Sequence, residues 1–87
     1  MIPAAKPLIG ADERAAVDAV LGSGMIAQGP QVASFEGEFS GVVGGRHCVA
    51  VNAGTSALLM ALIAVGVKPG DEVIVPSFTF AATANAV

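Results

Sequence analysis

The apolar positions follow a helical spacing in the first half of the chain and short unbroken runs in the second half. Asp12 and Glu13 open a predicted helix, where the helix dipole favours negative charge. Its apolar face follows at helical spacing: Ala16, Val17, Val20 and Leu21. Glycines at 22 and 24 end this helix, and Pro30 opens a second one, which places Val32, Phe35 and Phe39 on one stripe. Residues 1–45 are therefore predicted to be a helical lead.

The second half alternates apolar runs with breaker residues. Residues 46–51 and 72–75 are short and mostly apolar, which is typical of strands covered on both faces. Between them, residues 55–65 predict a helix that is apolar nearly all round and should be buried, and a last helix begins near Phe80. Residues 46–87 thus predict strand, helix, strand, helix. This order indicates an α/β fold with a largely parallel sheet.

The composition is that of a protein interior. The chain has 87 residues, of which 54% are apolar and 13% charged, and its mean hydropathy is +0.75. A free-standing domain of this length needs more polar surface than that. Residues 80–87 also predict a helix with no stop signal after it. We therefore expect a piece of a longer protein, with apolar faces that need more chain or a partner against them.

Charge and cysteine content exclude several classes of function. The net charge is −3 and the few basic residues form no patch, so a nucleic-acid partner is not expected. Cys48 has no disulfide partner within the sequence, and residues 1–7 lack the charged and apolar regions of a signal peptide. The longest apolar run, 57–65, is about half of a membrane span. His47 and Cys48 point to opposite faces of a strand, so they cannot share a metal. We expect a soluble cytoplasmic protein without a metal site.

The turn at residues 52–57 is the candidate site. In open α/β sheets, ligands bind at the carboxyl ends of the strands, and a helix N-terminus presents free N–H groups to anions. Gly54 lets a phosphate approach the backbone, and the hydroxyls of Thr55 and Ser56 add donors. Ser and Thr at this place are also ordinary helix caps, so the residues alone leave capping and phosphate binding both open. The turn is neither a P-loop nor a Gly-x-Gly-x-x-Gly fingerprint.

Three segments in order carry a more specific resemblance. They are NAGTSAL at 52–58, GVKPGDEVIVP at 66–76 and SFTFAATANA at 77–86, with upstream support from 23–30 and 35–36. With them, the chain resembles the N-terminal part of the pyridoxal-phosphate-dependent sugar aminotransferases of the DegT/DnrJ/EryC1/StrS family. The resemblance covers essentially the whole chain.

That resemblance implies a fold type I (aspartate aminotransferase-like) large domain and a homodimer with active sites at its interface. It implies that Thr55 and Ser56, next to Gly54, hold the phosphate of pyridoxal 5′-phosphate and that Phe80 stacks on its ring. A core position on a helix is the alternative for Phe80. Gln28 is expected near the nucleotide-sugar site, with a solvent-facing loop as its alternative. Leu59 and Ala53 depart from the family's usual polar residues without breaking the assignment.

The catalytic lysine and the acid at the pyridine nitrogen lie further downstream in the family. Neither Lys6 nor Lys68 fits the lysine's place, so no catalytic residue is assigned here. We expect the full-length protein to transfer an amino group, with glutamate as donor, to a nucleotide-linked keto sugar. A dehydratase of the same family, with histidine in place of the lysine, is one alternative. A truncated, non-catalytic remnant is another, and the 87 residues alone are expected to be inactive.

Overall fold

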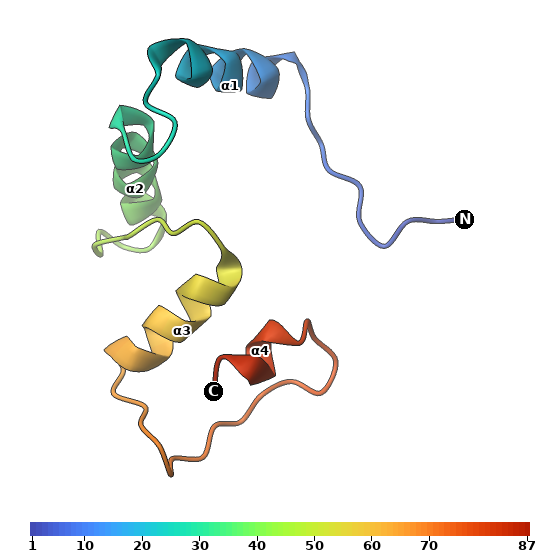
Figure 1. Ribbon diagram of the computed structural model, residues 1–87, viewed down its shortest axis with the longest axis vertical. Coiled ribbons are helices and arrows are strands. Elements are labelled where there is room, and N and C mark those ends of the chain that lie inside the picture. Colours follow the sequence, from blue (N-terminus) through green and yellow to red (C-terminus); the bar gives the residue numbers. More distant parts are fainter. The chain divides into compact units, whose positions relative to one another are not determined.

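The computed structural model describes all residues 1–87 and contains four helices and no strand (Figure 1). In chain order these are α1 (Ala11–Ser23), α2 (Pro30–Val42), α3 (Gly54–Ala64) and α4 (Ala82–Asn85). The chain divides into two compact units, Met1–Cys48 with α1 and α2, and Val49–Val87 with α3 and α4.

In the first unit, α1 begins and ends where the sequence predicts. The backbone N–H of Gly10, the residue before the helix, donates to the Glu13 carboxylate at 2.6 Å. Because Gly10 has no side chain, this is only the carboxylate half of a capping box. At the other end Gly24 adopts a left-handed conformation, φ 75°, and its N–H donates to the Leu21 carbonyl. A glycine adopts that conformation at little cost, so Gly24 ends the helix cleanly.

The second helix, α2, also confirms its prediction. Pro30 is its first residue, where the missing N–H is not needed. Phe35 and Phe39 lie one turn apart with ring centroids 5.8 Å from each other, as the predicted stripe requires. In the loop before α2, a Cβ on Gly29 would lie only 3.2 Å from the Met25 Cβ. The loop therefore closes tightly on itself, and only glycine fits there without a shift.

In the second unit, α3 ends in a Schellman motif. The N–H of Gly66, φ 85°, donates to the Ile63 carbonyl, and the N–H of Val67 donates to the Leu62 carbonyl. A turn follows from Lys68 to Asp71, with Pro69 second and Gly70, φ 95°, third, as a type II turn requires. After a further extended stretch, α4 comes into contact with α3. Ala82 in α4 is the one buried residue of the chain.

The predicted α/β class is not confirmed by the structure. Residues 46–51 and 72–75, expected to be strands, carry no strand assignment, and the last helix spans only Ala82–Asn85 rather than starting near Phe80. A strand exists only through the ladder of hydrogen bonds to its neighbour. Two short segments separated by a helix form no such ladder within these residues, although their side-chain pattern suits one.

The predicted burial of α3 does not hold within these 87 residues either. Four of its five large apolar side chains, Leu58, Leu59, Met60 and Ile63, are 40 to 66% exposed, and the fifth, Leu62, is half-buried. The chain exposes 7748 Å² in all, whereas two compact units of half its 8.5 kDa mass would together expose about 5,600 Å². Much apolar surface is therefore uncovered in each unit. None of the four helices has the length and apolar character needed to cross a membrane.

Candidate functional site

The candidate site is the first turn of α3. Its N-cap is Ala53, in an extended conformation (φ −154°, ψ 148°), and a methyl group cannot accept a hydrogen bond. The first N–H of this turn that is bonded belongs to Ala57, which donates to the Ala53 carbonyl at 3.1 Å. The N–H groups of Gly54, Thr55 and Ser56 make no hydrogen bond within the chain. An α-helix leaves such groups for a cap, water or a ligand.

This geometry decides against the capping role that the sequence left open. Thr55 and Ser56 are the second and third residues of the helix, not the residue before it. Neither hydroxyl satisfies a backbone N–H of the first turn. Both side chains therefore lie next to backbone N–H groups with which they make no hydrogen bond.

Neither the backbone conformation at position 54 nor packing within the chain requires a glycine there. Its φ is not positive, and a Cβ built on it would meet nothing within 4 Å. The absence of a side chain at Gly54 leaves open space beside the three free N–H groups. A phosphate oxygen can approach a backbone closely at such a place.

The electrostatics of the turn favour an anion. In α1, Asp12 and Glu13 occupy the first turn, and the hydrogen bond from the Gly10 N–H lowers the pKa of Glu13 from its ordinary value of 4.5. The carboxylates of Asp12 and Glu13 thus already offset the positive end of the α1 dipole. The first turn of α3 contains no acidic residue, so its dipole is not offset by the chain.

One polar contact of the turn could not be read from the motif alone. Ser56 Oγ donates to Asn52 Oδ1 at 3.4 Å. Asn52 belongs to the predicted turn at residues 52–57, but its residue type alone indicates no role there. Asn52 precedes the extended N-cap Ala53 and lies outside the helix, so the helical i, i+4 rule could not have indicated this contact.

Phe80 lies outside the helices, two residues before α4, and its side chain is 79% exposed. Its carbonyl accepts the Thr83 N–H at 3.0 Å, which begins the last turn. The alternative of a core position on a helix does not hold in these residues. No hydrogen bond links Phe80 to the first turn of α3, and stacking on a cofactor ring stays a prediction. Gln28 is exposed in its loop, and its role also stays a prediction.

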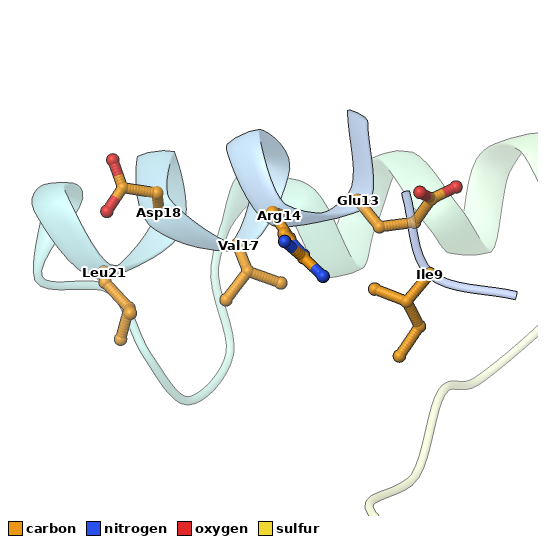
Figure 2. A pocket seen from close by; sticks show the side chains of 6 residues that line it. All are labelled: Ile9, Glu13, Arg14, Val17, Asp18 and Leu21. Carbon is orange, nitrogen blue, oxygen red and sulfur yellow. The ribbon is translucent and has the colours of Figure 1, made fainter. Parts of the chain in front are cut away.

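Two hollows of the chain lie away from this turn. A hollow of about 370 Å³ runs along α1, where Val17 and Leu21 lie below the helix together with Ile9 (Figure 2). Another, of about 280 Å³, lies at the opposite, C-terminal end of α3 and includes Val67 and Lys68. No group of three or more His, Cys, Asp or Glu side chains is placed to hold a metal ion. Gly54 and Thr55 are exposed, so the first turn of α3 lies at the surface of its unit.

Residues 7–87 match the model of the DegT/DnrJ/EryC1/StrS aminotransferase family, and the chain belongs to that family. Members of the family depend on pyridoxal phosphate and have fold type I. Among curated proteins, the chain is similar to the spore coat polysaccharide biosynthesis protein SpsC of Bacillus subtilis (strain 168). The two are 49% identical over 86 residues, which cover 99% of this chain and 22% of SpsC. The chain thus spans about a fifth of the length of that relative. No solved structure matches the chain.

The residues present fit the phosphate of this cofactor. Three free N–H groups, an open glycine and two neighbouring hydroxyls are the donor set that a phosphate dianion takes at a helix N-terminus.

Proposed function

We propose that this chain supplies the phosphate-holding part of a pyridoxal-phosphate-dependent aminotransferase that acts on a nucleotide-linked keto sugar, with glutamate as amino donor. The observation that carries the proposal is the uncapped first turn of α3 in a chain that belongs to this family. The name of the relative SpsC, a polysaccharide biosynthesis protein, supports a sugar as the substrate class.

Each site residue has a defined task in this proposal. The N–H groups of Gly54, Thr55 and Ser56 bind the phosphate oxygens, and Gly54 keeps the approach open. The exposed ring of Phe80 covers one face of the cofactor ring. The bound cofactor supplies an electron sink for the amino-group carbon, while the protein provides binding and orientation.

The lysine that bonds the cofactor and moves the proton is proposed to come from outside these residues. Lys68 lies beyond the C-terminal end of α3. A helix of 11 residues is about 16 Å long, which exceeds the reach of a lysine side chain back to its N-terminus. Lys68 is therefore not proposed as that lysine, and neither is Lys6 in the N-terminal lead.

We also propose that the complete protein is a homodimer and works in the cytoplasm. The uncovered apolar surface of both units supports a partner or further chain against them. The free thiol of Cys48 supports a reducing compartment.

The test uses the complete gene product with pyridoxal phosphate, glutamate and a nucleotide-linked keto sugar. We expect amino sugar and 2-oxoglutarate to form in equal amounts, as measured by mass spectrometry and a coupled assay. Loss of water from the sugar without consumption of glutamate would assign the dehydratase alternative. If the protein shows no visible absorption band with the cofactor, the proposal fails. Residues 1–87 alone serve as the control and should form neither product.

A further inference from the structure

The carboxamide of Asn52 accepts a hydrogen bond from Ser56 but does not cap the backbone of α3. Asn52 precedes the N-cap Ala53, and no side chain makes a capping hydrogen bond to the first turn of α3. The contact of Asn52 that the structure shows is the one from Ser56 Oγ to its Oδ1, at 3.4 Å. That distance is long for a hydroxyl donating to a carbonyl, so the bond is weak and easily exchanged.

The direction of this bond determines what Ser56 can do for an anion. A serine hydroxyl has one proton to donate and two lone pairs to accept with. While the proton points to Asn52 Oδ1, Ser56 cannot donate it to a phosphate. If the carboxamide rotates by half a turn, its NH₂ group donates to Ser56 Oγ instead, and the hydroxyl proton becomes available.

We propose that Asn52 is a positioning residue for the cofactor phosphate: its carboxamide rotates when the phosphate binds, donates to Ser56 Oγ and thereby directs the Ser56 proton to a phosphate oxygen. This inference rests on the proposed function, because it requires a phosphate at the first turn of α3. Asparagine suits the task because its side chain presents a donor and an acceptor at nearly the same place. An aspartate there could only accept, so it would keep the Ser56 proton away from the phosphate and repel the dianion.

The test measures equilibrium binding of pyridoxal phosphate and of pyridoxal, which lacks the phosphate, to the complete gene product. Ser56→Ala and Asn52→Leu are each expected to weaken pyridoxal phosphate binding by about 10- to 150-fold, the effect of losing one hydrogen bond to a charged group. The double variant should be no weaker than either single one, because both remove the same bond. Asn52→Asp should lose at least as much affinity as Asn52→Leu. Pyridoxal binding should stay unchanged in all of them.

A control variant and a phosphate-specific signal separate this role from a structural one. Asn85→Asp makes the same change at the only other asparagine, in α4, and should leave affinity unchanged. The ³¹P resonance of bound cofactor should shift in Asn52→Leu and in Ser56→Ala, while the thermal midpoints of the variants stay close to wild type.

Two results overturn the inference while leaving the proposed function in place. In the first, the losses in the two single variants multiply in the double variant. In the second, Asn52→Asp binds pyridoxal phosphate as tightly as wild type. The proposed function itself fails in a different way, if wild-type protein does not prefer pyridoxal phosphate to pyridoxal.

Discussion

Replacing Gly54 by alanine should stabilise the chain and at the same time weaken cofactor binding. Gly54 is the first residue of α3, its φ is not positive, and a Cβ there would meet nothing within 4 Å. Alanine therefore fits without strain. A glycine-to-alanine change at a compatible helical position stabilises by about 0.4–1 kcal/mol, largely because the unfolded chain loses conformational freedom.

The same methyl group would stand in the space through which a phosphate reaches the N–H groups of Gly54, Thr55 and Ser56. If the phosphate retreats and loses one charge-assisted hydrogen bond, the cost is about 1.5–3 kcal/mol. This corresponds to a dissociation constant for pyridoxal phosphate that is raised about 10- to 150-fold. The two effects have opposite signs, which a purely structural role of Gly54 does not predict.

The assay combines chemical denaturation of the complete gene product with titration of pyridoxal phosphate, followed by absorbance. Gly37→Ala is the matched control, because Gly37 lies inside α2 with nothing within 4 Å of its built Cβ. It should stabilise in the same way and leave cofactor affinity unchanged. If Gly54→Ala binds pyridoxal phosphate as tightly as wild type, the phosphate does not lie against this turn and the reasoning is refuted.

Four further outcomes are expected. Gly66→Ala should destabilise the protein by about 1 kcal/mol in denaturant unfolding, because Gly66 has φ 85° in the Schellman motif and a left-handed alanine is strained; a neutral result would contradict that geometry. The lowered pKa of Glu13 means that its stabilisation of α1 is present above pH 4.5 and is lost as pH falls through the lowered value. Circular dichroism should show this acid loss of helix, and Glu13→Gln should remove it. Phe80→Ala should weaken binding of both pyridoxal phosphate and pyridoxal, since the ring rather than the phosphate loses its contact; an effect on pyridoxal phosphate alone would argue against stacking. Residues 1–87 alone should associate with rising concentration in analytical ultracentrifugation and bind an apolar dye, whereas a compact monomer would show that their apolar faces need no cover.

The local features could be predicted from the sequence because neighbouring residues determine them. Pro30 and Gly24 mark helix ends through their own backbone preferences, and the lysine-to-aspartate turn follows from Pro69 and Gly70. The candidate turn could also be proposed from the sequence, since its motif at residues 52–58 lies within a few residues of Gly54. None of these features requires contact with a distant part of the chain.

Long-range structure is different, because a strand and a buried helix depend on partners. The apolar run at 72–75 has the side chains of a covered strand, yet no ladder forms in the structure, and α3 has the composition of a core helix, yet its side chains are exposed. The sequence by itself determined where α1 and α2 begin and end and where the candidate turn lies. Only the three-dimensional structure decided that Ala53 is the N-cap, that Thr55 and Ser56 are not, and that Asn52 reaches Ser56. The reason is physical: a cap depends on which residue leaves the helical conformation, and one residue of difference decides whether the N–H groups of the first turn are satisfied or free.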